Sequence, residues 1–243
     1  MSSLHRSALR CVQRRLFLRQ CLSLGAVGLL TGCNLEDADA VDRALFAMSR
    51  WNDRVQAALF SPNRLAPIYQ PEDITEPFPF NAYYAEPRAP VVDPATFSLV
   101  LGEGIADRRP WTLAELYALP QISQITRHIC IEGWSAIGQW SGVRFSDFLA
   151  RIGADTKSRF VAFRCADDYT SSIDMPTALH PQTLLAFRFR DQILPTRYGF
   201  PMKLRVPTKL GFKIPKHIVA ISITNEDPGG FWEKYGYNHF SGL

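Results

Sequence analysis

The sequence predicts an α+β protein that is mostly β, with a few short helices and a single main domain. Short runs rich in β-branched and aromatic residues recur after residue 96, separated by glycine, proline and polar turns. Apolar residues repeat at helical spacing over a long stretch near residues 40–60. With 243 residues, 47% hydrophobic and 21% charged, the composition is that of an ordinary globular protein.

Residues 1–32 have the layout of an export signal. Arg14 and Arg15, followed by Leu-Phe-Leu, precede an apolar run that ends at Leu30. This order is typical of a twin-arginine signal, and the run is shorter than the roughly 20 residues that a membrane-spanning helix needs. Leu30-Thr-Gly-Cys33 resembles a lipobox, although a cysteine can follow small residues by chance. We expect a lipoprotein of the periplasm, anchored to a membrane through Cys33.

The positive charge of the chain lies in this N-terminal segment. The whole chain carries a formal charge of +4, and residues 1–32 contain five arginines and no acidic residue. The remainder has 22 basic and 23 acidic residues, so its charge is near −1. A general nucleic-acid-binding surface is therefore not expected.

The cysteines limit the kinds of metal site that the chain can build. Cys11 and Cys21 would leave with the signal and Cys33 would be modified, so that Cys130 and Cys165 remain. The sequence contains no Cys-x-x-Cys motif, and structural zinc, iron–sulfur clusters and c-type haem are therefore not expected. In an oxidising compartment the two remaining cysteines could instead form a disulfide.

Taken in order, the chain begins with a tether and helix over 33–60, and the main domain follows over 61–243. Residues 61–94 hold eight of the seventeen prolines and predict an extended arm without a regular ladder. Thr112 and Glu115 form a capping-box pattern for a helix that ends at Leu119. Ser146 is expected to open a second helix over 147–152. The expected strands are 97–101, 122–131, 160–164, 169–173, 184–189, 202–206 and 218–224.

Cys130 lies near the end of the expected strand 122–131, with Trp134 and Trp140 after it. A thiolate can bind a soft metal or attack an electrophile, whereas a lone cysteine is often only a small buried hydrophobe. His128 would share its strand face and would be either the base of a thiol enzyme or a structural residue. The two tryptophans would line a substrate funnel or belong to the core.

A basic segment lies near the C-terminus. Between Asp191 and Glu226 there is no acidic residue. The cationic side chains in this window are Arg197, Lys203, Arg205, Lys209, Lys213, Lys216 and His217. Together with turn amides near Gly211, they predict a site for phosphate or another compact anion. The alternative is a solvated face whose lysines guard the edge of a sheet.

Three segments together resemble the sulfite oxidase family of molybdenum enzymes. They are Asn81-Ala-Tyr-Tyr84, Cys130-Ile-Glu-Gly-Trp134 with Trp140, and the glycine-, proline- and lysine-rich stretch from Gly199 to Lys216. The resemblance covers roughly residues 78–240. The motifs are most similar to the catalytic subunits of bacterial periplasmic methionine-sulfoxide reductases. The resemblance implies a sulfite-oxidase-type molybdopterin-binding fold with short peripheral helices.

The resemblance also implies roles for individual residues. Cys130 would bind molybdenum and be the catalytic residue, and Lys213 would complete the anion site for the pterin phosphate. The implied pterin contacts are Asn81, Tyr84, Tyr198, Lys203 and Lys216. Cys165 falls near a pterin contact that is usually threonine, and an inert buried thiol is an equal alternative. Tyr198, Lys203 and Thr208 depart from the Asn, Arg and Trp that relatives often carry.

The implied function is two-electron oxygen-atom transfer by an enzyme that contains molybdenum and molybdopterin. The expected substrate is a small-molecule S-oxide or N-oxide, and a membrane haem protein, a cytochrome or a quinone-linked protein would be the electron partner. Sulfite is less expected, because the arginine that follows the metal cysteine in sulfite oxidases is missing. Two alternatives stay open, a thiol enzyme using Cys130 with His128 and a non-catalytic lipoprotein that binds a partner.

Overall fold

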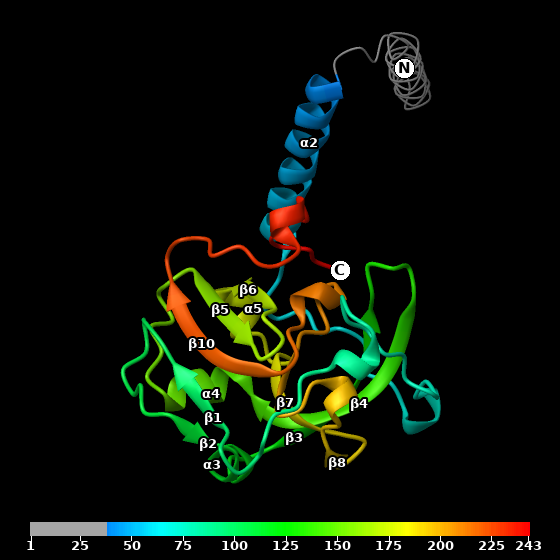
Figure 1. Cartoon of the computed structure of the whole chain (residues 1–243). Coiled ribbons are helices and arrows are strands. Elements are labelled where there is room, and N and C mark those ends of the chain that lie inside the picture. Colours follow the sequence, from blue (N-terminus) through cyan, green and yellow to red (C-terminus); the bar gives the residue numbers. More distant parts are fainter. Residues whose placement is uncertain (1–37) are drawn as a thin grey trace, which may run out of the picture. The chain divides into compact units, whose positions relative to one another are not determined.

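The computed structural model describes residues 38–243 (Figure 1), so the expected export signal and lipobox cysteine lie outside the described residues. Residues 50–243 form one compact unit. Helix α2, Ala38–Leu59, confirms the helix expected near residues 40–60. Within the described part of the chain, no helix combines the length and apolar character that crossing a membrane requires.

The first sheet has five strands in the order β2-β1-β10-β5-β6. Its strands are β1 Ser98–Leu101, β2 Trp111–Thr112, β5 Phe160–Cys165, β6 Thr170–Asp174 and β10 Ile218–Thr224. Strand β10, orange in Figure 1, lies parallel to β1 and antiparallel to β5. The last strand of the domain thus joins elements that are more than fifty residues apart in the sequence.

The second sheet carries the strand that leads to Cys130. It follows the order β3-β4-β7-β8, and β9 also pairs with β7. Its strands are β3 Ile122–Ile129, β4 Ser135–Arg144, β7 Leu184–Phe189, β8 Gln192–Ile193 and β9 Lys203–Arg205. Strands β3 and β4 form a long antiparallel hairpin, the green elements in Figure 1. The fold is therefore mostly β with few helices, as the sequence predicts.

Three short helices accompany the sheets, α3 Leu113–Tyr117, α4 Phe145–Arg151 and α5 Met175–Ala178. The capping box of α3 is present, because the Thr112 hydroxyl accepts from the Glu115 amide and the Glu115 carboxylate accepts from the Thr112 amide. The expectation that Ser146 opens the next helix is wrong. Helix α4 begins one residue earlier, where the Phe145 amide donates to the Thr183 carbonyl instead of to a side-chain cap.

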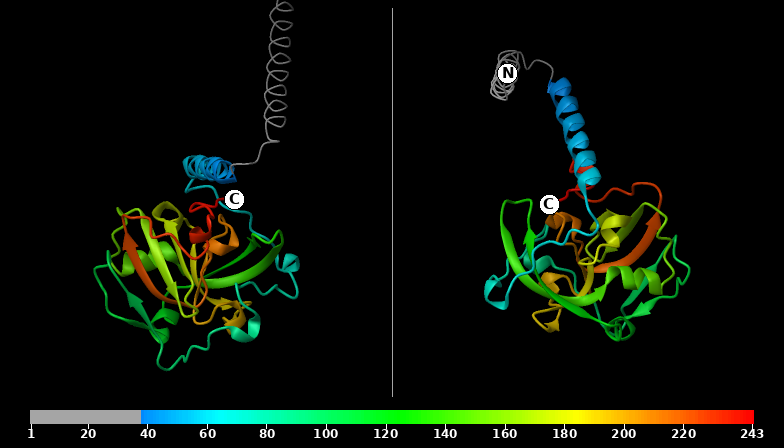
Figure 2. Two further views of the ribbon diagram at one scale, coloured as in Figure 1. Left: turned by 45° about the horizontal axis from the view of Figure 1, so that its top comes forward. Right: turned by 180° about the vertical axis from the view of Figure 1, so that it is seen from behind.

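The proline-rich segment is an extended arm with two short 3-10 turns, Pro71–Asp73 and Glu86–Arg88. It is held to the β3–β4 hairpin by an isolated bridge between Ile68 and Thr126 and by a bond from the Tyr69 amide to the Ile125 carbonyl. The arm, cyan in the right-hand view of Figure 2, lies against this hairpin. It brings residues 78–84 to the same region as the end of β3.

The main hydrophobic core takes side chains from both sheets, including Leu99, Val161 and Ile221 from the first and Leu185 and Leu204 from the second. A smaller aromatic cluster holds Phe78, Trp140, Phe189 and Tyr198. Trp140 is fully buried there. Of the two interpretations of this tryptophan, the core residue is correct.

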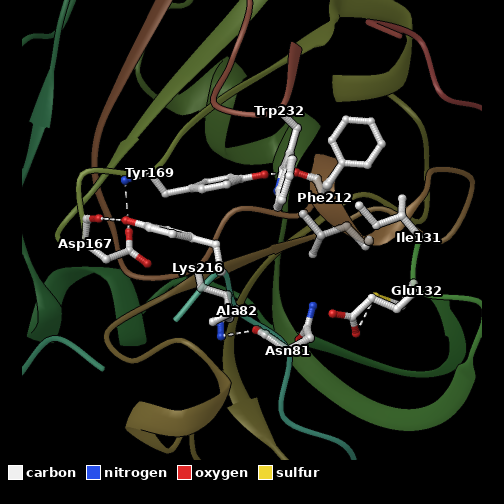
Figure 3. A pocket seen from close by; sticks show the side chains of 13 residues that line it. Asn81, Ala82, Ile131, Glu132, Asp167, Tyr169, Phe212, Lys216 and Trp232 are labelled. Atoms are coloured by element: carbon white, nitrogen blue, oxygen red, sulfur yellow. Dashed lines mark hydrogen bonds between the residues drawn. The ribbon is translucent and has the colours of Figure 1, made fainter. Parts of the chain in front are cut away.

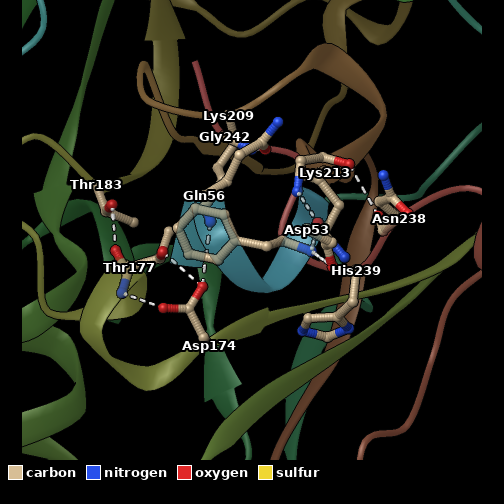
Figure 4. Close-up of polar contacts among 12 residues, drawn as sticks. Asp53, Gln56, Asp174, Thr177, Thr183, Lys209, Lys213, Asn238, His239 and Gly242 are labelled. Atoms are coloured by element: carbon tan, nitrogen blue, oxygen red, sulfur yellow. Dashed lines mark hydrogen bonds and ion pairs between the residues drawn. The ribbon is translucent and has the colours of Figure 1, made fainter. Parts of the chain in front are cut away.

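The C-terminal segment is fastened across the basic segment. The Asp53 carboxylate accepts hydrogen bonds from the amides of Phe240 and Ser241, and the Gln56 side-chain oxygen accepts from the Gly242 amide (Figure 4). The Ser241 carbonyl in turn accepts from the Leu210 amide. These bonds fix the turn that leads into the 3-10 helix Gly211–Lys213.

Candidate functional site

Cys130 stands at the first position of the turn that joins β3 to β4. Its amide donates to the Trp134 carbonyl at 2.9 Å, and its carbonyl accepts from the Gly133 amide. Gly133 has φ +87°, in the left-handed region that glycine reaches without steric cost. Expected at the end of a strand, Cys130 instead lies one residue beyond Ile129, where the hairpin turns. This turn fixes the position of the sulfur.

The Cys130 thiol lines a cavity that is built by five separate segments. The lining residues come from the arm, the β3–β4 turn, the loop after β5, the basic segment and the C-terminal segment. They are Asn81, Ala82, Tyr83, Cys130, Ile131, Glu132, Asp167, Tyr169, Gly211, Phe212, Ile214, Lys216 and Trp232 (Figure 3). Three of the segments that carry the family resemblance thus meet at one cavity.

The thiol is buried and uncharged at neutral pH. Cys130 is only 8% exposed, and its Sγ lies 3.6 Å from the Glu132 carboxylate. Burial raises the pKa of the Cys130 thiol, and the Glu132 carboxylate raises it further. Cys130 and Cys165 are both free thiols, so the disulfide alternative is wrong. A thiol with a raised pKa lacks the activation that a nucleophilic cysteine needs.

His128 sits behind the cavity on the same face of β3, and it is held by neighbours rather than free to act as a base. The Arg205 guanidinium donates to His128 Nδ1 at 3.2 Å. Arginine is always a donor, so a neutral His128 carries its proton on Nε2, which faces the Asn81 side-chain amide at 3.4 Å. Burial and the nearby cations Lys203, Arg205 and Lys216 hold the pKa of His128 well below its usual value. Its role here is structural.

Six of the seven cationic side chains of the basic segment are buried, whereas Arg197 is 40% exposed and pairs with Glu86. Lys203, Arg205, Lys209 and Lys213 are at most 1% exposed, and Lys216 is 8% exposed. The alternative of a solvated face whose lysines guard a sheet edge is therefore wrong. The single sequence had allowed it, because a run of lysines around turns also suits an exposed surface.

Only part of this buried positive charge is balanced by the protein. Lys209 pairs with Asp174 at 3.3 Å, and Lys213 pairs with Glu233. Among residues 38–243, Lys203, Arg205 and Lys216 have no carboxylate partner. A buried charge without a partner is costly. The excess positive charge therefore calls for an anion.

The unpaired cations converge on one place. Lys203 and Arg205 are two residues apart on β9 and therefore face the same side. Burial, followed by the positive charges of Arg205 and Lys216, lowers the pKa of Lys203 well below its usual value. The Lys216 amine donates to the Asn81 carbonyl at 2.6 Å, and burial lowers its pKa to about 8. A Cβ built at Gly199 would lie 3.0 Å from the Lys216 Cβ and 3.3 Å from the Lys203 Cβ. Gly199 thus allows the segments that carry Lys203 and Lys216 to approach closely.

The chain is similar to known proteins in sequence and in fold. The family model described as "Oxidoreductase molybdopterin binding domain" matches residues 86–232. The chain belongs to the molybdopterin-binding oxidoreductase family. It is accordingly a molybdenum cofactor-dependent oxidoreductase with a sulfite-oxidase-like fold, and its cofactor is molybdopterin with molybdenum.

Two curated relatives cover most of the chain. A protein of Azospira oryzae named "Putative protein-methionine-sulfoxide reductase subunit YedZ1" is 58% identical over 94% of this chain and 87% of its own length. A protein of Burkholderia mallei named "Protein-methionine-sulfoxide reductase catalytic subunit MsrP" is 25% identical over 93% of this chain and 76% of its own length.

One solved structure shares the fold. It is the sulfane dehydrogenase SoxCD of Paracoccus pantotrophus, with a TM-score of 0.53 and 17% sequence identity. The match covers 59% of this chain and 41% of that chain.

The residues around the cavity fit the cofactor of the family. A molybdopterin carries a phosphate, and Lys216, a buried cation without a carboxylate partner, lines the cavity. A soft sulfur donor suits molybdenum, and the Cys130 thiol lines the cavity. Among residues 38–243, no three His, Cys, Asp or Glu side chains gather into a metal site. One protein thiol is thus the donor that this region offers.

The structure places the predicted site residues at different distances from the cavity. Asn81, Cys130 and Lys216 line it directly. Tyr84 donates to the carboxylate of Asp167, a lining residue, at 2.8 Å. Cys165 is a buried free thiol, and burial, followed by the nearby Asp167 carboxylate, raises its pKa well above the usual value. Their roles toward the cofactor stay predictions.

The other three predicted residues have partners within the protein. Lys203 lies over the Trp140 ring, with its amine 4.7 Å from the ring centre. Tyr198 packs in the aromatic cluster and donates from its hydroxyl to the Phe78 carbonyl at 2.9 Å. Lys213 is occupied by Glu233, so it would have to exchange partners to hold a phosphate. Their roles toward the cofactor also stay predictions.

Sequence reasoning missed the aromatic wall of the cavity and Asp167. The Tyr83 ring stacks on Phe231 with centroids 4.5 Å apart, and Trp232 lines the cavity beside it. Asp167 accepts from the Tyr84 hydroxyl and follows β5 in a short loop. Tyr83 lies within the Asn81–Tyr84 segment, but no local motif marks Asp167 or Trp232. Trp232 reaches the site because the C-terminal segment packs against β6, where the Phe231 amide donates to the Thr170 carbonyl.

Proposed function

We propose that this chain is the catalytic subunit of an exported reductase that removes an oxygen atom from S-oxides, with methionine sulfoxide as the leading substrate and N-oxides as a second class. The observation that carries the proposal is a single buried thiol in a cavity that is also lined by aromatic side chains and by the buried, unpaired Lys216. The names of the two relatives, both methionine-sulfoxide reductase subunits, support the choice of substrate.

Individual residues of the chain would have separate roles toward the cofactor. Cys130 would bind molybdenum through its thiolate, because metal binding displaces the thiol proton. Lys203 and Lys216, with Asn81, would hold the anionic and polar parts of the cofactor. When bound, the cofactor would supply the atom that takes up the oxygen and the two electrons that reduce the substrate. The overall reaction consumes the S-oxide, two electrons and two protons, and yields the sulfide and water.

The aromatic side chains would select the substrate. Tyr83, Phe212 and Trp232 present ring faces and edges to the cavity, and a thioether or sulfoxide sulfur packs favourably against aromatic rings. The Glu132 carboxylate lies beside the Cys130 sulfur and also accepts from the Trp134 indole at 2.8 Å. A fixed negative charge at this place disfavours anionic substrates such as sulfite. Neutral oxides would suffer no such repulsion.

The proposal includes export and an electron partner. The twin-arginine pattern and the lipobox predict a folded, cofactor-loaded protein that is anchored through Cys33 in the periplasm. The chain carries no haem-binding motif in its sequence, so a separate membrane haem protein or a cytochrome would deliver the electrons. Fractionation of the host, with detection of the protein and of lipid on Cys33, tests this part.

The activity is tested on purified, molybdenum-loaded protein with a reduced viologen dye as the electron source. We expect turnover of methionine sulfoxide, measured as the methionine formed, and weak or no oxidation of sulfite with ferricyanide. Metal-loaded protein that reduces neither S-oxides nor N-oxides would contradict the proposal.

A further inference from the structure

A second cavity lies on the other side of β3 from the cofactor cavity. Its floor includes Arg127 and Ile129, which lie on either side of His128 along β3 and so face away from it. It is open to solvent and has a volume of about 720 Å³. We call it the outer cleft. Its lining residues are Gln56, Leu59, Phe60, Ser61, Arg64, Leu65, Ala66, Pro67, Tyr69, Arg127, Ile129, Pro207, Thr208, Phe240, Gly242 and Leu243.

The side chains that line the outer cleft carry positive charge. Its lining contains two arginine side chains and no Asp or Glu side chain. The Arg127 guanidinium lies 5.1 Å from the centre of the Tyr69 ring. Within the described part of the chain, neither Arg64 nor Arg127 makes an ion pair with a carboxylate. Both charges are therefore available to an acidic ligand.

Large apolar side chains surround these charges and face solvent. Leu59 is 79% exposed, Leu65 53% and Leu243 59%, and the neighbouring Ile68 is 64% exposed. Scattered exposed leucines are normal on a protein surface, whereas several around one concave site mark a binding surface.

The wall of the outer cleft is fixed by buried polar side chains. Gln182 accepts from the Ala66 amide at 2.7 Å and donates to the Ala66 carbonyl at 2.9 Å. The His180 Nε2 lies 3.1 Å from the Arg64 carbonyl. Both side chains are at most 5% exposed. Because these bonds hold residues 64–66 in place, the cleft is preformed and a ligand would not have to order it.

We propose that the outer cleft docks an extended segment of the electron partner, a segment that carries both acidic and apolar side chains. The two arginines complement acidic residues, and the exposed leucines complement apolar anchors. A concave site suits an inserted peptide segment better than the flat surface of a lipid bilayer. A partner seated here contacts β3 directly behind the residues that face the cofactor cavity. This inference rests on the proposed function, because it assumes that electrons come from a separate protein.

The test compares two electron sources on the full-length, cofactor-loaded protein. One source is a reduced viologen dye, which needs no docking, and the other is membrane vesicles from the native host with a reduced quinol pool. The charge variant is Arg64→Glu with Arg127→Glu. The matched control is Arg151→Glu with Arg164→Glu, two exposed arginines outside both cavities. A second variant, Leu59→Ser with Leu65→Ser, changes exposed side chains alone and so leaves the fold intact.

We expect the charge variant to lose about tenfold in vesicle-supported turnover, equivalent to about 1.4 kcal/mol, because the two substitutions put negative charge where the acidic segment would dock. Its dye-supported turnover should stay within about twofold of the wild type, and the control variant should match the wild type with both donors. The serine variant should behave like the charge variant. Unchanged vesicle-supported turnover in the charge and serine variants would overturn the inference.

Three further results bear on the inference. A photoreactive phenylalanine analogue at Leu65 should crosslink to one acidic, apolar segment of a haem protein in the host membrane. In a second result, the wild type would bind protein-free phosphatidylglycerol vesicles as well as it binds the host membrane vesicles. If the charge variant lost this binding, the cleft would be assigned to lipid and the inference would be overturned. Failure of dye-supported turnover in the wild type would overturn the proposed function, and the crosslink would still test the cleft.

Discussion

At the scale of single residues, burial without a carboxylate partner is what makes a lysine a candidate for an anion site. The amine of Lys216 is held by the Asn81 carbonyl, and burial lowers its pKa to about 8. The sequence shows the number of lysines in the basic segment but not their burial. Burial depends on how β9 and the turns after it pack beneath the arm, which is a tertiary feature. The anion site was therefore predicted, whereas its depth was not.

This burial predicts a pH-dependent affinity for anions. With the metal-free chain and sulfate as the probe, we expect binding to weaken as the pH rises through about 8. The protonated amine that attracts the anion is present below this pKa and is lost above it. Sulfate keeps the same charge over this range, so the change would come from the protein. Calorimetric titration between pH 7 and 9.5 measures it.

The Lys216→Met variant is the control for that titration. It should bind sulfate weakly, with little dependence on pH in this window, since the titrating amine is gone. A wild-type affinity that stays constant across the window would show that Lys216 is not part of the anion site.

At the scale of elements, the sequence predicted those helices and strands whose signal lies within a few neighbouring residues. The capping box at Thr112 is a signal within four residues, and α3 confirms it. Strand β4 was not predicted, because glycines and tryptophan interrupt its alternation. A Cβ built at Gly142 would lie 2.0 Å from the Leu185 carbonyl oxygen, so this glycine permits β4 and β7 to approach. That requirement comes from a partner strand forty residues away.

The two helix starts give a matched pair for mutation. Thr112→Ala removes the side-chain acceptor of the Glu115 amide and should lower the free energy of unfolding by about 1 kcal/mol. Ser146→Ala should leave it nearly unchanged, because Ser146 does not cap α4 and its hydroxyl reaches only the exposed Asp147 carboxylate. Urea denaturation of both variants measures the difference, and equal losses would refute the assignment.

The 3-10 turn at Gly211 links an element to the site. A Cβ at Gly211 would lie 2.6 Å from His128 Nε2 and 3.2 Å from the Ile129 carbonyl oxygen. We expect Gly211→Ala to displace His128 and to lower stability by about 1–3 kcal/mol. It should also reduce molybdenum content, measured by elemental analysis.

Gly229→Ala is the control for strain alone. Gly229 has φ +63° and nothing within 4 Å of a built Cβ, so the substitution should cost about 1–2 kcal/mol and leave the metal content unchanged. Metal loss of the same size in both variants would show that the contact with His128 is not the cause.

At the scale of the whole molecule, three separated sequence segments predicted the family, and the family model over residues 86–232 confirms it. What the sequence could not supply is the aromatic wall of the cavity, which consists of Tyr83, Phe212 and Trp232. This wall forms only when the C-terminal segment packs on β6 and the arm crosses it. The outer cleft is also a product of long-range packing. It joins the end of α2, the arm, β3 and the C-terminal segment.

The central claim is that the Cys130 sulfur holds the molybdenum of the cofactor. Elemental analysis of protein from a cofactor-competent host tests it most directly, with Cys130→Ser compared with the buried thiol variant Cys165→Ser. The account predicts about one molybdenum per chain in the wild type and in Cys165→Ser, and little in Cys130→Ser. Equal molybdenum in Cys130→Ser and the wild type would contradict it.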